Sequence, residues 1–187
     1  MERVLVLIKP DGVERALIGR VTAIFEEAGL KVVGLKMLKA QKSVIERHYT
    51  DDEEWLLSVG KKSKQSYFEK GIKVQKTERE IGMEIRQRLI KEISKSPIVA
   101  MVLEGNAAAE ASRKMAGGTE PKKADPSTIR GKFSTDSYGL ADAEKRPIRN
   151  IVHVSENAEI AENEIKIWFR EDELFDCKRA DEGAMHG

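Results

Sequence analysis

The sequence has a single cysteine and almost no excess of charge of either sign. Cys177 has no second cysteine to pair with, which excludes an internal disulfide and any metal site built from several cysteines. Lysine and arginine number 33 against 32 aspartates and glutamates, for a net charge of +1. This balance argues against a dedicated nucleic-acid-binding protein, which would carry a strongly basic surface. The basic run from Lys61 to Lys76 could contact RNA or an acidic partner, but the balanced total favours a solvated helical hairpin.

Long apolar runs are also missing. The N-terminal run, Val4 to Ile8, is too short for the hydrophobic part of a secretory signal or for a membrane span. We therefore expect a cytoplasmic protein with no membrane partner. The sequence has no internal repeat, no low-complexity segment and no acidic cluster that suggests a dedicated metal site. Its 187 residues are enough for one domain with a substantial core.

The segment from Arg149 to Phe169 carries the clearest chemical signal. A short apolar strand surrounds His153, formed by Ile151, Val152 and Val154. A helix begins after the capping residues 155–157, and its predicted buried stripe consists of Ala158, Ala161, Ile165 and Trp168. Glu164 lies beside this stripe, where an unpaired carboxylate would be costly. We expect Glu164 to reach back to the strand and hold the imidazole of His153, as an acid orients a nucleophile.

Each of these residues also has a plainer explanation. A single histidine beside an apolar strand is usually structural, and Glu164 could be one more charge on a charged helix. The order of the whole segment favours chemistry: Arg149-Asn150, His153, Ser155, Glu164, and then Ile165 to Phe169. This order resembles the signature of nucleoside diphosphate kinases, Asn-x-x-His-x-Ser followed by a helix with Glu and by Ile-x-x-Trp-Phe. In that family the histidine takes a phosphoryl group from one nucleotide and passes it to another.

The resemblance covers most of the chain. The other matching blocks occur in the family's order: Leu5 to Val13, Gly29 to Lys36, His48-Tyr49, Ser96 to Gly105, Arg113 with Gly117 to Pro121, and Thr128 to Gly131. The exceptions are residues 56–80, residues 134–147 and the end of the chain. We therefore expect a single domain over residues 1–175, with an insertion at about 56–80 and an extended loop at about 134–147. A polar tail is expected over 176–187.

Hydrophobic periodicity predicts an α+β fold. The predicted strands are residues 4–8, 30–38, 98–103 and 150–154. The predicted helices are residues 13–27, closed by Gly29, then 43–57 and 78–95, and residues 58–76 are a polar connection of uncertain form. Without additions the order is βαββαβ, the ferredoxin-like sandwich with a four-stranded antiparallel sheet. The resemblance implies the same fold.

The resemblance also assigns residues to the nucleotide. Arginine offers a planar fork for phosphate oxygens, and a hydroxyl that follows two glycines suits the same anion. By resemblance, the phosphates are held by Arg113, Thr119 and Arg130. Lys9 and Asn150 match residues that contact the sugar hydroxyl and approach phosphate, whereas Tyr49 and Ser155 match residues beside the reacting phosphoryl group. A single arginine is more often a solvated surface charge, so the assignment depends on the joint order of the blocks.

The aromatic residue that stacks on the base in the family falls in a segment that differs here. Trp55 is the first candidate for this role, and Tyr67 and Phe68 are alternatives; an anchor in the core explains Trp55 equally well. Two further residues depart from the family. Val154 stands where many relatives have a small residue, and Lys132 stands where the family usually has an acid.

The predicted activity is transfer of the γ-phosphoryl group from a nucleoside triphosphate, typically ATP, to a nucleoside diphosphate. One site serves both substrates, so a phosphohistidine at His153 implies ping-pong kinetics. Mg²⁺ is expected to arrive on the nucleotide phosphates rather than in a protein cage. Relatives form hexamers or tetramers, so we expect a homo-oligomer, and we interpret His48 as structural. The alternative function is a non-catalytic nucleotide sensor or interaction scaffold on the same fold.

Overall fold

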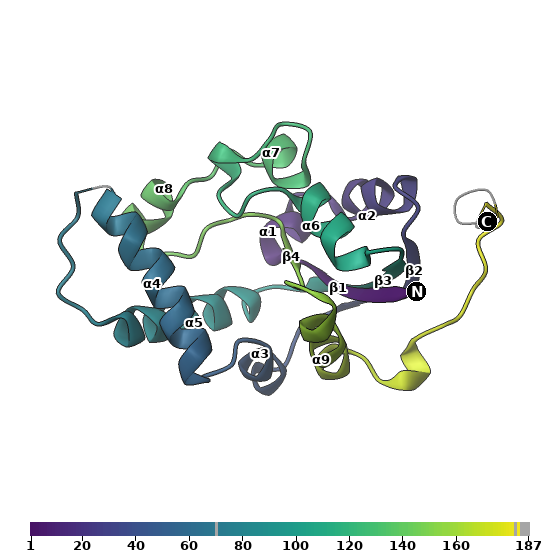
Figure 1. Ribbon diagram of the computed structural model, residues 1–187, viewed down its shortest axis with the longest axis horizontal. Coiled ribbons are helices and arrows are strands. Elements are labelled where there is room, and N and C mark those ends of the chain that lie inside the picture. The colour runs from purple at the N-terminus through teal and green to yellow at the C-terminus, as the bar shows by residue number, and fades with distance from the viewer. Residues whose placement is uncertain (70, 182, 184–187) are drawn as a thin grey trace.

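The computed structural model describes residues 1–69, 71–181 and 183. Residues 70, 182 and 184–187 lie outside the described residues. The last residues of the polar tail predicted over 176–187 are therefore among those not described. The strands are β1 (Glu2–Ile8), β2 (Lys31–Leu38), β3 (Ile98–Gly105) and β4 (Val152–Val154). They form a four-stranded antiparallel sheet in the order β2-β3-β1-β4 (Figure 1). The predicted ferredoxin-like fold is confirmed.

The helices cover both faces of this sheet, and they are α1 (Pro10–Glu14), α2 (Ile18–Glu27), α3 (Lys42–His48), α4 (Glu53–Glu69), α5 (Glu78–Ile93), α6 (Ala108–Ala116), α7 (Ile129–Phe133), α8 (Tyr138–Ala143) and α9 (Ala158–Trp168). Short 3₁₀ turns occupy Pro121–Lys123 and Glu171–Glu173. Among the described residues, no helix is long and apolar enough to cross a membrane.

Strand β1 separates the core into two parts. Val4, Val6 and Ile8 point toward α2, α6 and α7, whereas Leu5 and Leu7 point toward α3, α5 and α9. Successive side chains of a strand point to opposite faces, so a strand covered on both sides is apolar at every position. This explains the continuous run from Val4 to Ile8. The central position of β1 makes its C-terminal end a rigid support for the residues that follow it.

Two predicted helices are wrong because each is interrupted by a turn. The helix predicted over 13–27 is divided at Ala16, whose φ of 55° is left-handed, and its first part begins earlier, with Pro10 in the first turn. Gly29 does follow α2, with a φ of 89°. The helix predicted over 43–57 stops at His48, and a new one begins where the Asp52 carboxylate accepts the N–H groups of Glu54 and Trp55.

The segment 58–76, predicted as a polar connection, is mostly helical. Helix α4 runs on to Glu69 and packs against α5, which begins with a capping box between Thr77 and Glu80. Glycines allow the two helices to approach closely. A Cβ on Gly82 would lie 2.2 Å from the carbonyl oxygen of Leu56, and one on Gly60 would lie 1.8 Å from that of Glu78. Helices α4 and α5 therefore form a tight hairpin.

The strand predicted over 150–154 is shorter than expected. Ile151 has a φ of 69°, and its backbone is held outside the ladder. Its carbonyl accepts the Lys9 N–H at 2.7 Å, and its N–H donates to the Asp11 carboxylate at 3.0 Å. Only Val152–Val154 pairs with β1. In the helix that follows, Ala161, Ile165 and Trp168 are buried as predicted, whereas Ala158 is exposed because it begins the first turn.

Candidate active site

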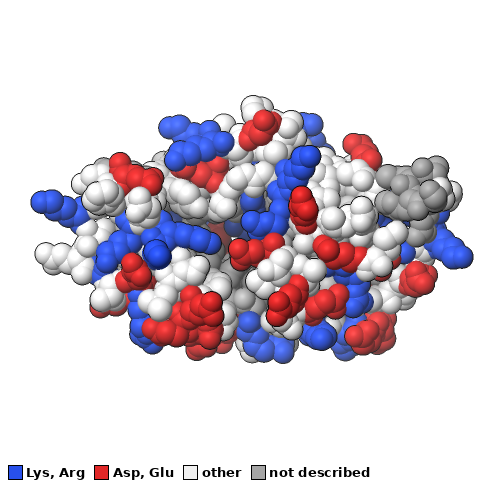
Figure 2. All heavy atoms as spheres, viewed as in Figure 1, with Lys and Arg blue, Asp and Glu red and all other residues white. Residues whose placement is uncertain are grey.

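Residues from distant parts of the chain meet around one cavity of about 750 Å³. The cavity is lined by nine residues that the sequence predicts for the site: Lys9, Tyr49, Trp55, Arg113, Thr119, Arg130, Asn150, His153 and Glu164. It lies between the α4–α5 hairpin and the part of the fold that carries β4, α6 and α9. The face drawn in Figure 2 is hollowed between these two parts, and lysine and arginine side chains border the hollow. A cavity of this size accommodates a nucleotide.

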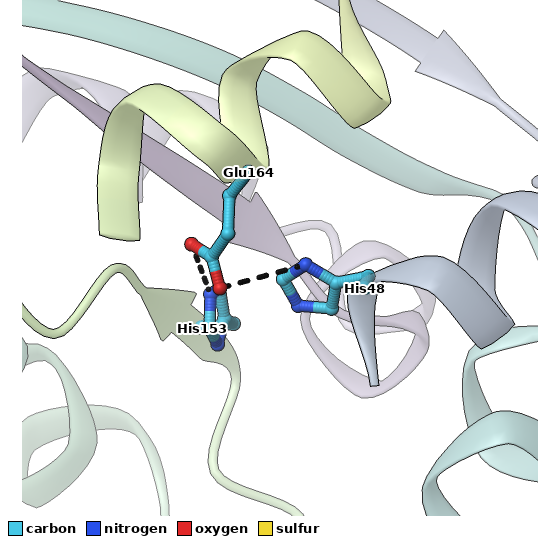
Figure 3. Close-up of side chains that lie close together, drawn as sticks. All are labelled: His48, His153 and Glu164. Atoms are coloured by element: carbon cyan, nitrogen blue, oxygen red, sulfur yellow. Dashed lines mark hydrogen bonds and ion pairs between the residues drawn. The ribbon is translucent and has the colours of Figure 1, made fainter. Parts of the chain in front are cut away.

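His153 lies on the short strand β4 opposite Leu7 of β1. Its Nε2 is 3.1 Å from Oε2 of Glu164, which comes from α9 (Figure 3). The side chain of His153 is 23% exposed, so it is both held by the protein and accessible from the cavity. The predicted pairing of this histidine with Glu164 is therefore present.

Glu164 is an ionised acceptor in this arrangement. Its Oε2 also accepts a hydrogen bond of 2.5 Å from Oγ of Ser155, a residue that is fully buried. Burial alone would raise the pKa of Glu164, but His153 and the hydrogen bond from the Ser155 hydroxyl lower it to about 2. A carboxylate only accepts hydrogen bonds, so the neutral imidazole of His153 carries its proton on Nε2. Nδ1 then holds the lone pair, on the side of the ring away from Glu164.

Lys9 and Asn150 form a buried polar pair directly after β1 and before β4. Lys9 Nζ donates to Asn150 Oδ1 at 2.5 Å, and Asn150 Nδ2 donates to the carbonyl oxygen of Thr119 at 2.9 Å. Burial lowers the pKa of Lys9 to about 8. The positive charge of Arg130 also lowers this pKa, whereas the negative charge of Asp11 raises it. An anion bound beside Lys9 would raise this pKa and stabilise the charged form of the lysine.

Arg130 and Arg113 bring further positive charge to the same cavity. Arg130 donates to the carbonyl oxygens of Gly117 and Val152 at 2.6 and 2.9 Å, and its buried Nε has no partner among the described residues. Burial and the nearby Arg113 lower the pKa of Arg130 to about 10. Two neighbouring cations of this kind are stabilised when an anion with several oxygens lies between them. Such an anion is a phosphate.

Aromatic residues form one wall of the cavity. Tyr49 is buried, which raises its pKa, and its ring centroid lies 6.3 Å from that of Trp55. Trp55 packs against the core and also lines the cavity, so both explanations of this residue hold in part. Tyr67 lines the cavity as well, whereas Phe68 is 79% exposed and does not. The structure favours Trp55 or Tyr67 over Phe68 as a surface for a base.

Several residues that line the cavity are not predicted by the sequence motifs. Lys62 of α4 and Arg88 of α5 face the cavity, as do Tyr138 and Asp142 of α8. For Lys62, the sequence signal is the basic run 61–76, which we interpret as solvated. The two segments that depart from the family also meet in space, because the Tyr67 hydroxyl donates to Asp142 Oδ1 at 3.5 Å. Together they form the side of the cavity opposite α9.

Among the described residues, one cluster has the spacing of a metal site: His48, His153 and Glu164, with ligand atoms within 4.8 Å of one another. An ion held there would compete for the carboxylate that already binds His153 and Ser155. The geometry instead suits a nucleophile. His153 presents a lone pair, Glu164 can neutralise the charge that develops on the ring, and three cations surround the place where an electrophilic phosphorus would lie.

Comparison with known proteins gives a consistent result. The sequence model of the family "Nucleoside diphosphate kinase" matches residues 2–73 and 77–174. A nucleoside diphosphate kinase from Pyrobaculum aerophilum is 46% identical over 181 residues, and the match covers 94% of this chain and 99% of that protein. A crystal structure of an NDP kinase from the same organism superposes with a TM-score of 0.90, at 44% identity, and covers 94% of this chain and 99% of its own.

A second solved structure is informative about chemistry. It is a transition-state mimic of the nucleoside-diphosphate kinase from Borrelia burgdorferi with bound vanadate and ADP. It is 37% identical to this chain, with a TM-score of 0.79, and the match covers 98% of this chain and 95% of that one.

Proposed function

The chain belongs to the nucleoside diphosphate kinase family, and we propose that His153 is the residue through which it transfers the phosphoryl group. The protein acts as a nucleoside diphosphate kinase, moving the γ-phosphoryl group of a nucleoside triphosphate to a nucleoside diphosphate. The observation that carries the role of His153 is its hydrogen bond from Nε2 to Glu164, which leaves the lone pair on Nδ1 in a residue that lines the same cavity as Lys9 and Arg130.

In the first half-reaction, the Nδ1 lone pair attacks the γ-phosphorus, and the bond from that phosphorus to the β–γ bridging oxygen breaks. The nucleoside diphosphate leaves with the electron pair of that bond. The ring keeps its Nε2–H, so the imidazole of the phosphohistidine carries a positive charge that faces the Glu164 carboxylate. In the second half-reaction, a terminal oxygen of another diphosphate attacks the phosphorus, and the P–N bond breaks. His153 then returns to its starting state, which accounts for ping-pong kinetics.

Lys9, Arg113 and Arg130 stabilise the charge that spreads over the oxygens of the transferred group. Thr119 adds a hydroxyl at the same anion, and Asn150 holds Lys9 in place and contacts the sugar hydroxyl. The Tyr49 phenol, kept neutral by burial, donates toward the reacting group. These assignments are supported by the shared cavity and by the resemblance of the motifs.

The residues of this site fit an Mg²⁺ ion that arrives bound to the nucleotide. The carboxylates that line the cavity are those of Asp142, Glu156 and Glu164, and the last is already bound to His153 and Ser155. The family uses magnesium nucleotides. When bound with the nucleotide, Mg²⁺ would supply charge neutralisation on the phosphates, and Lys9, Arg113 and Arg130 would hold those phosphates.

The base lies against the aromatic wall, with Trp55 as the stacking residue and Tyr67 as the alternative. Both line the cavity, and stacking of this kind discriminates poorly among bases. The protein works as a homo-oligomer, a hexamer or a tetramer, in the cytoplasm, as the family resemblance implies. Residues 1–175 form its single domain, with the insertion near 56–80, the loop near 134–147 and the tail 176–187 as additions.

The test is incubation with γ-labelled ATP and magnesium, without a second nucleotide. We expect acid-labile label on the unaltered protein and none on His153→Ala, with release of the label as GTP when GDP is added. ATP binding to both proteins is measured in parallel. A protein that binds ATP but never takes up label would contradict the role of His153 and favour a nucleotide sensor or scaffold.

A further inference from the structure

His48 lies against the proposed nucleophile, although no step of the reaction uses it. It is the last residue of α3, and its side chain is only 1% exposed. Its ring centroid is 4.5 Å from that of His153, with the two planes at 84°. On its other sides it contacts the rings of Tyr49 at 4.7 Å and Trp168 at 5.6 Å. The ring of His48 therefore fills the space between the rings of Tyr49, His153 and Trp168.

Trp168 selects one tautomer of this histidine. The indole Nε1–H of Trp168 donates to His48 Nδ1 at 3.2 Å, so Nδ1 must be an acceptor. A neutral His48 then carries its proton on Nε2, which is buried and has no partner among the described residues. A buried N–H without a partner costs stability, and the hydrogen bond from Trp168 offsets part of that cost. The remaining contacts of His48 point to a reason for a histidine here besides stability.

The position of Glu164 suggests that reason. Its Oε1 lies 3.6 Å from Nδ1 of His48, whereas its Oε2 contacts His153 (Figure 3). The same Oε2 accepts from Ser155. Since Nδ1 of His48 already accepts from Trp168, it offers no proton to Oε1. Burial, and then the neighbouring His153, lower the pKa of His48 to about 3, so it adds no positive charge here. A charged His48 would compete with His153 for the single carboxylate.

We propose that His48 is a positioning residue for phosphoryl transfer: fixed by Trp168, its neutral ring packs at right angles against His153 and holds that ring with Nε2 toward Glu164 and Nδ1 toward the substrate. This inference rests on the proposed role of His153. It replaces the interpretation of His48 as a purely structural residue.

Two substitutions test the contribution of the His48 ring and that of its hydrogen bond separately. His48→Asn keeps an acceptor for Trp168 but removes the ring that contacts His153. His48→Phe keeps a ring of similar size but leaves the Trp168 N–H without its acceptor. Label uptake from γ-labelled ATP is measured in a single turnover, together with nucleotide affinity and urea unfolding. Val21→Ala serves as the control for lost stability alone, because Val21 lies on the buried face of α2 and does not line the cavity.

We expect His48→Asn to take up label roughly 10- to 100-fold more slowly, because a small misorientation of a nucleophile has an effect of this size. Nucleotide affinity should be unchanged, since Lys9, Arg113 and Arg130 hold the phosphates independently. His48→Phe should be faster than His48→Asn even where it is less stable. Val21→Ala should lose stability and keep its rate. Rates that follow stability across all three variants, or an unaltered rate in His48→Asn, would overturn the inference.

Nitrogen NMR of the unaltered protein tests the tautomers without any substitution. We expect His48 as the Nε2–H tautomer at neutral pH, without titration near the usual value of about 6.5. A His48 that becomes charged in that range, or that carries its proton on Nδ1, would overturn the inference. The role of His153 fails separately, if the unaltered protein takes up no label at all.

Discussion

At the scale of single residues, one carboxylate oxygen has two tasks. Oε2 of Glu164 accepts from both His153 and Ser155, and this double contact orients the histidine and fixes its proton on Nε2. Glu164→Gln would keep an oxygen for one of these donors but remove the negative charge that faces the phosphorylated ring. We expect label uptake to fall roughly 10- to 100-fold, as for other supporting carboxylates, with little change in nucleotide KM. Stopped-flow single turnover checks this, and a rise in KM at unchanged kcat would contradict it.

Lys9 gives the free enzyme a pH dependence on the alkaline side. Its pKa of about 8 in the folded protein means that it binds phosphate as a cation below that pH and loses its charge above it. We expect kcat/KM for the diphosphate to fall as the pH rises through about 8. In Lys9→Gln the affinity should be lower and the profile flat in this range. An unaltered protein with a flat profile there would show that another group holds the phosphate.

Lys9 should also make the stability of the folded protein depend on pH. Stability should rise with pH, whereas kcat/KM should fall. The folded pKa of Lys9, about 8, lies below the ordinary value of 10.5, so the unfolded chain holds this proton more tightly. The contribution of Lys9 to folding is therefore unfavourable below pH 8 and becomes less so as the pH rises toward 10.5. Urea unfolding of the unaltered protein and of Lys9→Gln, without nucleotide, isolates this effect from binding.

At the scale of elements, the α4–α5 hairpin depends on two glycines that let the helices touch. A methyl group on Gly82 would meet the carbonyl oxygen of Leu56, next to Trp55 in the cavity wall. We expect Gly82→Ala to lose about 1–3 kcal/mol of stability, because neither helix backbone can yield cheaply. Nucleotide KM should rise as the wall with Trp55 moves.

Gly19 provides the matched control for this hairpin. It also lies in a helix, α2, but a Cβ there would meet nothing within 4 Å. Gly19→Ala should therefore gain about 0.5–1 kcal/mol from helix propensity and leave KM unchanged. Urea unfolding and steady-state kinetics of the two variants make the comparison. Equal effects at both positions would show that the close approach of α4 and α5 does not matter.

Elements with a strong periodic pattern could be predicted, and the breaks between them could not. The run from Val4 to Ile8 and the repeat Ile81, Ile85, Leu89, Ile93 are confirmed as β1 and α5. The interruption of the predicted helix at Ala16 cannot be recognised from the hydrophobic pattern, because apolar residues continue at helical spacing on both sides of Ala16. The cap at Asp52 was readable in principle, since an aspartate before acidic residues is a common helix start.

The candidate site shows a similar limit. Residues inside motifs, such as His153, Lys9 and Arg130, were found because their neighbours fix their place in the chain. Lys62 and Arg88 reach the cavity only through the packing of α4 on α5 and its closeness to α8, which no local pattern records. His48 was recognisable as buried, but its contact with His153 joins residues on different elements.

At the scale of the whole molecule, strand β2 lies at an edge of the sheet and carries exposed apolar side chains. Leu35 is 50% and Met37 is 58% exposed. An apolar edge strand invites pairing with another chain, so we expect these residues to be covered in the oligomer. Sedimentation of the unaltered protein should give a multiple of the 21.0 kDa chain mass.

The double substitution Leu35→Glu, Met37→Glu tests whether this edge is an interface. Two carboxylates in an apolar contact would have to be buried without partners, so the double variant should dissociate to a smaller species. Leu35→Ile, Met37→Leu keeps the surface apolar and should remain assembled. Circular dichroism distinguishes dissociation from unfolding. A double glutamate variant that stays assembled would place the interface elsewhere, and an unaltered protein that sediments as a monomer would contradict the oligomer itself.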